Sequence, residues 1–393
     1  MINNNLNSSN IILSTNIFYK FILLLYLSML YAFFDEYKNI IQIIFSITFL
    51  FYFLTRRKKL TVFFLWNFIF IIWCFLSIFW SSNTEQTLIE TRIMIEIAIV
   101  SNLFIVYVDN KEKLITVYKF LVIAGIIYVF RLLFEFPLST WLEGRLGSEG
   151  QFNPNRIGLY LTISAIFSFY LAQTRHKFYY MLFIVFGLVV SLTGSRKAFL
   201  MLLLGILLLY YLNKGKNLTK KILAIPILIG ILIIGLFIVY NVPILYEILG
   251  SRLDSLITVF TNTGVGDNSI NERSQMIEIG RMLFLDKPFF GYGLGSYGLE
   301  SGLGEYSHNN YIELLVGLGI IGLLIYYSMF IFIMIKLYIV RDRILSNPIF
   351  VILFLLLIMD YGLVSYNGFL YQFIIALGFI ALRITKYFNQ PKL

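Results

Sequence analysis

The chain has 393 residues, of which 59% are hydrophobic and 18% aromatic, whereas only 13% are charged. A soluble globular domain is about 45–50% apolar, so this composition excludes a soluble globule and indicates a polytopic membrane protein. The formal net charge is +10. The sole cysteine, Cys74, lies in an apolar run, which excludes a disulfide within the chain and a thiolate metal cluster.

Apolar runs of about 20 residues can cross a bilayer as helices, because a helix satisfies its own backbone in hydrocarbon. The runs here are continuous rather than alternating, which favours helices over a β-barrel. We therefore predict an all-α polytopic bundle that forms a single integral-membrane domain over residues 1–393. About twelve spans are predicted, at residues 17–34, 39–55, 60–80, 88–108, 114–135, 157–173, 178–194, 197–212, 222–240, 308–337, 347–364 and 368–388.

The connections between these spans alternate in charge, which predicts their orientation because basic loops stay in the cytoplasm. The basic set is Lys20, Arg56, Arg57, Lys58, Lys59, Lys111, Lys113, Lys119, Arg175, Lys177, Lys214, Lys216, Lys220, Lys221, Lys336, Arg341, Arg343, Arg383, Lys386 and Lys392. Both termini are then cytoplasmic, and the large loop at 241–307, between spans 9 and 10, faces outward. Short helices are predicted in this loop at 245–261 and 271–285.

The positive charge is thus explained by topology and by contact with anionic lipid headgroups. The chain shows no glycine-rich phosphate loop, basic-aromatic platform or zinc-ligand spacing, so we expect no nucleic-acid partner, no cofactor and no metal. Glu90, Glu96 and Asp360 lie in or near spans, where an acidic side chain usually faces the bundle interior.

Several basic residues on the predicted outer side break the charge bias. Arg145 and Arg156 lie in a turn-rich loop, Arg196 and Lys197 follow a short hairpin, and Arg273 lies in the large loop. Each of them can contact lipid phosphate at the interface. Alternatively, converging guanidinium groups form a bidentate clamp for phosphate or pyrophosphate. For Arg145, Arg196 and Arg273, which lie in turn-rich or polar surroundings, we favour the clamp.

The segment SHNNYIE at 307–313 joins the large loop to a long apolar helix and contains one of only two histidines. A polar helix cap is one interpretation of this segment. Histidine is also the side chain best suited to accept a proton near neutral pH, so His308 is a candidate general base. A helix N-terminus disfavours the imidazolium and keeps the ring neutral, but it also binds phosphate, so His308 can instead be a phosphate ligand. Glu313 is a second candidate base, an orienting residue or a buried neutral acid.

Four short motifs occur between residues 152 and 322. They are FNPN at 152–155 with Gly158, TGSR at 193–196, Arg273 followed by KPFFGYG at 287–293, and His308-Asn309 followed by Gly319 and Gly322. They resemble motifs of the bacterial O-antigen polymerase and O-antigen ligase superfamily. The likeness spans about residues 140–335. Each motif alone is weak, but the four occur in the right order and on the predicted outer side, which makes the combined signal specific.

The resemblance implies a metal-independent, inverting glycosyl transfer at the outer face of the bacterial inner membrane. The donor is an oligosaccharide on undecaprenyl pyrophosphate. The acceptor is the end sugar of another lipid-linked unit in a polymerase, or lipid A core in a ligase. The resemblance also adds Asn155, Ser195 and Asn309 as supporting residues, and a flippase and a chain-length regulator as possible partners alongside membrane lipids.

We favour a polymerase of O-antigen, capsule or exopolysaccharide because the Asn-Pro-Asn loop and the Pro-x-x-Gly-x-Gly approach resemble polymerases more closely. The ligase is the alternative within the same superfamily. A lipid-glycan transporter or flippase is a third interpretation, but the two halves of the chain show no self-similarity of the kind common in transporters. We expect Arg145, Arg196, Arg273 and His308 to surround a cavity that opens sideways to lipid.

Overall fold

The computed structural model describes residues 2–32, 35–56, 60–141, 144–148, 152–214, 218–255, 268–339 and 343–388, and this part of the chain is helical without strands. The all-α class is therefore confirmed. The elements are α1 (Ile2–Ala32), α2 (Asp35–Arg56), α3 (Val62–Leu76), η1 (Ser77–Trp80), α4 (Thr84–Tyr107), α5 (Lys111–Glu135), η2 (Leu138–Trp141), α6 (Pro154–Thr174), α7 (Tyr179–Leu192), α8 (Arg196–Asn213), α9 (Leu218–Asn241), α10 (Pro243–Leu245), η3 (Tyr246–Gly250), α12 (Asn268–Asp286), α13 (Tyr297–Glu300), α14 (Asn310–Ile339), α15 (Arg343–Met359) and α16 (Phe369–Phe388).

Each of the twelve predicted spans overlaps a described helix, although the number of crossings stays a prediction. Six described helices are long and apolar enough to cross a membrane, and a seventh span arises if the bent pair Ile233–Asn241 and Pro243–Ser255 is counted as one. Four shorter apolar helices lie at Asn16–Ala32, Tyr179–Leu192, Ile344–Met359 and Phe369–Thr385. The predicted loop helix at 271–285 lies within α12, whereas the one at 245–261 lies in part outside the described residues.

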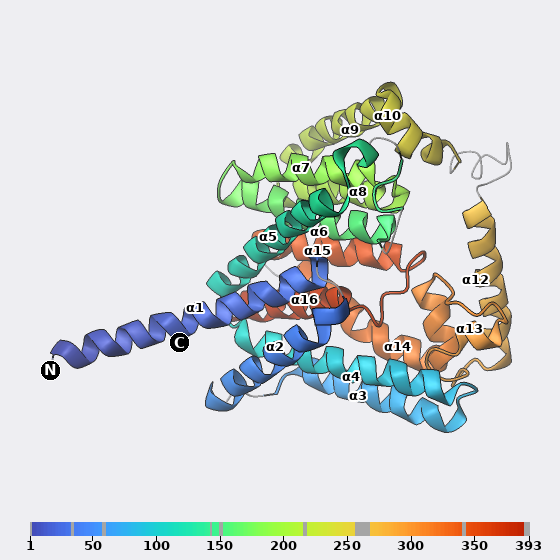
Figure 1. Ribbon diagram of the computed structural model, residues 1–393, viewed down its shortest axis with the longest axis horizontal. Helices are drawn as coiled ribbons and strands as arrows, with labels where there is room; N and C mark the ends of the chain where they lie inside the picture. The colour runs from blue at the N-terminus through green and yellow to red at the C-terminus, as the bar shows by residue number, and fades with distance from the viewer. Residues whose placement is uncertain are drawn as a thin grey trace.

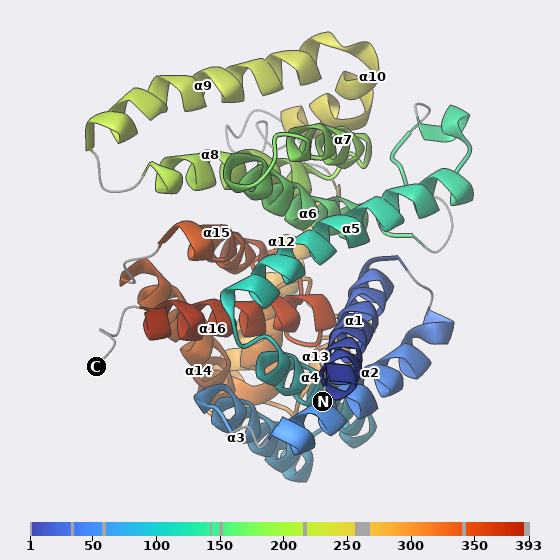
Figure 2. The same ribbon diagram turned by 90° about the vertical axis from the view of Figure 1, so that its left-hand side faces the viewer.

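The helices form two groups that are joined by α15 and α16, and also by α1 and α2, which link α5 to α4 (Figure 2). On one side α6 packs against α5, α7 and α8; on the other α14 packs against α3, and α3 packs against α4. Between them, α15 contacts α8 and α14, while α16 contacts α4 and α14. At one end of the bundle α12 lies across the start of α14, beside α13 (Figure 1). This end brings together residues that are far apart in the sequence.

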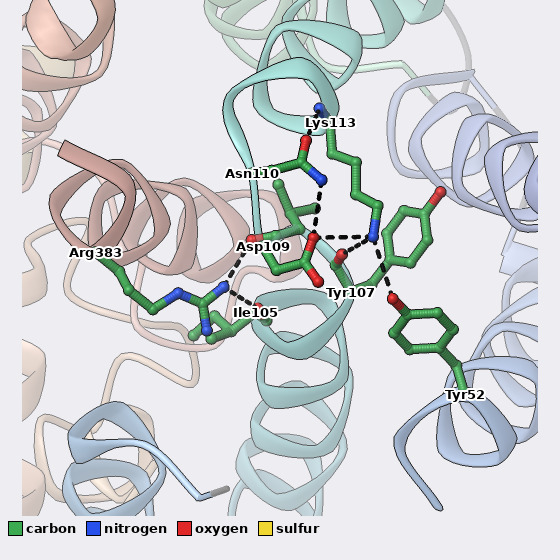
Figure 3. A network of polar contacts seen from close by, with 8 residues as sticks. Tyr52, Ile105, Tyr107, Asp109, Asn110, Lys113 and Arg383 are labelled. Atoms are coloured by element: carbon green, nitrogen blue, oxygen red, sulfur yellow. Dashed lines mark hydrogen bonds and ion pairs between the residues drawn. The ribbon is translucent and has the colours of Figure 1, made fainter. Parts of the chain in front are cut away.

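A basic network closes the opposite end of α4 (Figure 3). Arg383 donates to the carbonyl oxygens of Ile105 and Val108, and Lys113 Nζ donates to Asp109 Oδ1 and to the Tyr52 hydroxyl, at 2.7 to 3.1 Å. The last carbonyls of a helix have no intrahelical partner, and a cation near them also complements the helix dipole. The network therefore joins α2, α4, α5 and α16 at the end that carries the predicted cytoplasmic charges.

A buried polar network fixes the turn at 360–368, which joins α15 to α16. Asn310, fully buried at the start of α14, accepts from the backbone N–H groups of Ser365 and Tyr366 at 2.9 Å and donates to the Tyr327 hydroxyl. Asp360 accepts from Tyr327 at 2.6 Å and from Ser365 Oγ at 2.7 Å. Because every one of these groups is buried, each would be costly to leave unpaired. The turn is thereby held against α14.

The predicted long helix at 308–337 is interrupted within α14 at Gly319, where φ is 67° and ψ is −173°. The carbonyls freed by this break accept from neighbouring groups: Val316 O from Tyr292 N–H at 2.8 Å, Gly317 O from Gly293 N–H at 2.9 Å and Leu318 O from Trp73 Nε1 at 3.1 Å. A broken helix is tolerated in a membrane protein only where such partners exist. The loop at 287–295 is therefore built into the membrane domain, alongside the break.

We predict that Gly319→Ala lowers the free energy of unfolding by roughly 2–4 kcal/mol, because a side chain is strained at this positive φ and its Cβ would overlap the Phe289 carbonyl. The measurement is thermal unfolding of the purified protein in detergent. Gly230→Ala is the matched control, since nothing lies within 4 Å of a Cβ there and alanine favours a helix interior. Equal melting temperatures for the two variants would contradict the proposed constraint.

Candidate functional site

A cavity of about 360 Å³ opens where the ends of several helices meet. The lining residues come from α1, α2, α6, α8, α12, the segment before α14, the end of α15, the turn at 360–368 and the start of α16. They are Met29, Leu30, Lys38, Asn153, Asn155, Arg156, Leu159, Tyr160, Lys197, Ala198, Arg273, Tyr306, His308, Met359, Gly362, Leu363, Asn367, Gly368, Phe369, Leu370 and Tyr371. We call it the basic cavity because lysine and arginine side chains line it.

Four cationic side chains line the basic cavity, each from a different helix, and none of the described lining residues carries a carboxylate. The cations are Lys38, Arg156, Lys197 and Arg273. Lys38 Nζ lies 4.8 Å from the ring centre of Phe369, and the Arg156 guanidinium lies 5.3 Å from that of Tyr160. Cations gathered in one hollow raise the local concentration of anions. Apolar side chains from α1, α6 and the turn complete the wall, so the cavity suits an anionic group attached to an apolar chain.

The starts of α6 and α8 are held together beneath the basic cavity. Asn153 caps α6 by accepting from the N–H groups of Asn155 and Arg156. Ser195 caps α8 and donates through Oγ to Asn155 Oδ1 at 2.9 Å. A Cβ at Gly158 would lie 2.7 Å from that of Ala198, so only glycine allows this close approach. The predicted supporting residues Asn155 and Ser195 are therefore in contact.

Lys197 connects the joined starts of α6 and α8 to the turn at 360–368. Its Nζ donates to the carbonyl oxygen of Gly362, whose neighbour Leu363 also lines the cavity. A side chain at 362 would collide with the lysine, so the absence of a Cβ makes room for the ammonium group. The buried Asn310 network holds this same turn, which places Lys197 relative to α14.

The segment at 306–309 adopts an unusual backbone that presents His308 to the basic cavity. His308 has φ of 55° and is the one described non-glycine residue with a positive φ. Its ring lies 4.2 Å from that of Tyr306, and its Nε2 is 4.0 Å from Glu305 Oε2. A non-glycine residue in this region is strained unless its surroundings hold it, and such strain often marks a functional site.

Glu313 and Asn309 supply that support. Glu313 is 4% exposed, and its Oε2 accepts from both the backbone N–H and the hydroxyl of Ser307, at 2.9 and 2.7 Å. Asn309 caps α14 by accepting from Tyr311 and Ile312 N–H at 3.0 and 3.1 Å. Glu313 does not line the basic cavity. Both side chains therefore fix the residues on either side of His308.

Burial, and after it the charge of Arg273, lower the pKa of His308 below its ordinary value, and Lys197 acts in the same direction. Glu305 opposes this shift but does not outweigh it. The imidazole is consequently neutral, and able to accept a proton, at neutral pH. The helix dipole predicted the same direction from the sequence, whereas in the structure the leading causes are burial and a neighbouring cation.

Of the three arginines predicted to form a clamp, Arg273 lines the basic cavity and the other two lie outside its lining. Arg145 Nε donates to Thr193 O at 3.2 Å and borders a separate hollow of about 60 Å³. Arg196 donates to Arg252 O at 3.1 Å and to Ser255 Oγ at 2.8 Å. Both thus hold the hairpin and the start of α8 against neighbouring segments.

Lys38, Arg156 and Lys197 were not predicted from the sequence as members of the phosphate clamp. Residues 196 and 197 begin a helix, so their side chains point about 100° apart and only one of the two can face the cavity. The adjacent position of Arg156 beside Asn155 was a usable signal, because both belong to the first turn of α6. Lys38 offers no local signal, since only the packing of α2 brings it here.

Residues 180–327 match a protein family described as O-antigen ligase. The match confirms the resemblance to the O-antigen ligase and polymerase superfamily and indicates glycan transfer of the ligase or polymerase type, without separating the two. It includes Ser195, Arg196, Arg273, His308 and Glu313 but not Arg145 or Asn155. Comparison with curated proteins gave no match. With the apolar helices, the family match indicates a membrane protein.

We predict that His308 titrates below its ordinary pKa of about 6.5, and that Arg273→Ala raises this pKa because a positive charge leaves its surroundings. The measurement is an NMR titration of histidine-labelled protein in detergent. Only His176 and His308 give signals, so His176→Gln assigns them. A His308 pKa that is unchanged or lower in Arg273→Ala would contradict the assigned cause.

Proposed function

We propose that this protein is a polysaccharide polymerase, which transfers a glycan from undecaprenyl pyrophosphate to the end sugar of another lipid-linked repeat unit. The observation that carries the proposal is the basic cavity, in which four cations, an apolar wall and a neutral His308 meet. The family match over residues 180–327 supports the same class of chemistry.

The donor pyrophosphate is bound in the basic cavity. Arg273 and Arg156 supply guanidinium groups that suit phosphate oxygens, and Lys197 and Lys38 add point charges. The apolar side chains of α1 and α6 receive the first part of the polyprenyl chain, which stays in the membrane. Arg145 and Arg196, predicted with Arg273 to bind pyrophosphate, act on this site through the hairpin and the start of α8 that they hold.

The reaction is a single inverting displacement. The acceptor hydroxyl oxygen attacks the anomeric carbon, its proton passes to His308, and the bond from that carbon to the pyrophosphate oxygen breaks. The electron pair leaves with undecaprenyl pyrophosphate, where negative charge grows. Fixed cations at this position lower the barrier, so the reaction proposed here needs neither a metal nor a cofactor. A positioned general base contributes about 10²–10⁴-fold to such a step.

Glu313, the second predicted catalytic residue, is assigned a positioning role. Its carboxylate accepts two hydrogen bonds from Ser307, next to His308, and it lies outside the lining of the basic cavity. Asn309 and Ser195 also act from outside the lining, by capping α14 and α8. Asn155 lines the basic cavity and joins α6 to α8 through its hydrogen bond with Ser195.

We place the protein in the bacterial inner membrane with the basic cavity at the outer face. The basis is charge: the Lys113 and Arg383 network lies at the end of α4 away from Asn83, and basic residues favour the cytoplasmic side. A flippase that delivers the donor and a chain-length regulator are the expected partners in the membrane.

A ligase that transfers finished glycan to lipid A core is the second candidate, favoured by the description of the matching family. The polymerase and the ligase use the same donor chemistry and differ in the acceptor. A strain that lacks the gene separates them when its glycans are resolved by size, in lipid-linked and cell-surface fractions. Single repeats at the surface indicate a polymerase, long polymer left on undecaprenyl pyrophosphate indicates a ligase, and normal surface polymer removes both candidates.

Complementing that strain with His308→Ala or Arg273→Ala should leave its glycan defect uncorrected. In vitro, we expect His308→Ala to reduce the transfer rate by about 10²–10⁴-fold because the proton acceptor is lost. Arg281→Ala is the matched control for Arg273→Ala, since Arg281 lies on the same helix, is exposed and pairs with Glu278. Full polymer length with His308→Ala, at wild-type protein levels, would refute the assigned role of His308.

A further inference from the structure

A second and larger cavity, of about 890 Å³, adjoins the basic cavity. Tyr306, Leu363 and Asn367 line both, so these side chains lie at the boundary between the two hollows, and His308 lies two residues beyond Tyr306. The remaining lining residues are Asn83, Gln86, Glu90, Gly295, Gly298, Leu299, Gly302, Gly304, Glu305, Glu313, Val364 and Tyr366. Its volume lies within the range of about 300–1,000 Å³ that is usual for ligand sites.

The charge of this second cavity is opposite to that of the first. Three carboxylates line it, from Glu90, Glu305 and Glu313, and none of its described lining residues is a lysine or arginine. Within the described residues, no three acidic, histidine or cysteine side chains are grouped so that they could hold a metal ion. Each carboxylate can accept hydrogen bonds. We call this hollow the acidic cavity.

Glu90 is oriented by two side-chain amides that also line the acidic cavity. It is 8% exposed and accepts from Gln86 Nε2 at 3.2 Å and from Asn367 Nδ2 at 3.0 Å. Each amide keeps its oxygen and one N–H for a ligand. Carboxylates and amides held in this way offer the donors and acceptors that neighbouring sugar hydroxyls need.

Glu313 adds a buried acceptor without a partner. The side chain is more than nine-tenths buried, and the two hydrogen bonds that it receives, both from Ser307, go to Oε2. Among the described residues, none donates a hydrogen bond to Oε1. This oxygen is not completely enclosed by the protein, and Glu313 lines the acidic cavity. A buried acceptor left free costs free energy unless water or a ligand pairs with it.

We infer that the acidic cavity binds the terminal sugars of the acceptor glycan, and that it selects an uncharged saccharide over one that carries a carboxylate or phosphate. This inference rests on the proposed function, since it supplies the acceptor for the donor bound in the basic cavity. Carboxylates accept hydrogen bonds from sugar hydroxyls and repel anions. Tyr306, which is 49% exposed, offers an aromatic ring on which a pyranose can stack at the boundary. A sugar hydroxyl at this boundary reaches His308 from the side opposite the pyrophosphate.

The test is calorimetric titration of the full-length protein in lipid nanodiscs with two probes. One probe is the host repeat-unit oligosaccharide released from its lipid carrier, which has no pyrophosphate; the other is inorganic pyrophosphate. We expect Gln86→Ala and Glu90→Gln to weaken oligosaccharide binding by about tenfold, the loss of one or two hydrogen bonds, and to leave pyrophosphate binding unchanged. Glu85→Gln is the matched control, an exposed acid on the same helix that is not among the lining residues.

A second comparison tests the selection. Oxidising the terminal primary hydroxyl of the oligosaccharide to a carboxylate should weaken binding to the wild type about tenfold, and Glu90→Gln should reduce this penalty because one repelling charge is removed. Oligosaccharide binding that is unaffected by both α4 variants would overturn the inference. Pyrophosphate binding that Arg273→Ala leaves unchanged would instead overturn the proposed function, so the two failures are distinguishable. Retained pyrophosphate binding also shows that the α4 variants fold.

Discussion

The hydrogen bonds of Asn310 are the constraint on which both cavities depend. This one side chain pairs with two backbone N–H groups of the turn at 360–368 and with Tyr327, and its own backbone N–H donates to Asp360 O at 2.7 Å. The turn supplies Gly362 to the basic cavity, Tyr366 to the acidic cavity, and residues 363 and 367 to both. In a membrane bundle, where apolar burial between helices offers little driving force, such buried polar pairs decide which helix ends stay together.

The two cavities differ in charge because different helices contribute to them. The cations come from α2, α6, α8 and α12, whereas the acids come from α4, from the segment that leads into α14 and from the first turn of α14. The imidazole of His308 at their boundary is subject to opposing influences. Burial and the neighbouring cations favour its neutral form, whereas Glu305 favours the protonated form. That balance suits a group that must gain a proton during a reaction and release it afterwards.

The sequence predicted most of the helices, since continuous apolar runs determine where a chain can cross a bilayer. It predicted Arg273 and His308 at a cavity, because each has a polar or turn-rich context that is unusual beside apolar spans. Asn155 and Ser195 were named only through the family resemblance, and their contact with each other was not predicted. Which of Arg196 and Lys197 faces the cavity could not be decided without knowing the rotational phase of α8, which begins at Arg196. The break at Gly319 was not predicted, because a glycine in an apolar run equally permits close packing of a continuous helix.

The segment from Tyr292 to Asn309 is attached at both ends to the helix that follows it. Its first residues pair with the carbonyls at the break of α14, and its last residues are held by Glu313 one turn into the same helix. A rigid-body shift of α14 therefore carries Tyr306 and His308 with it, together with the turn fixed by Asn310. The distance between the two cavities is then fixed by α14. The loop moves with this helix and does not act as an independent lid.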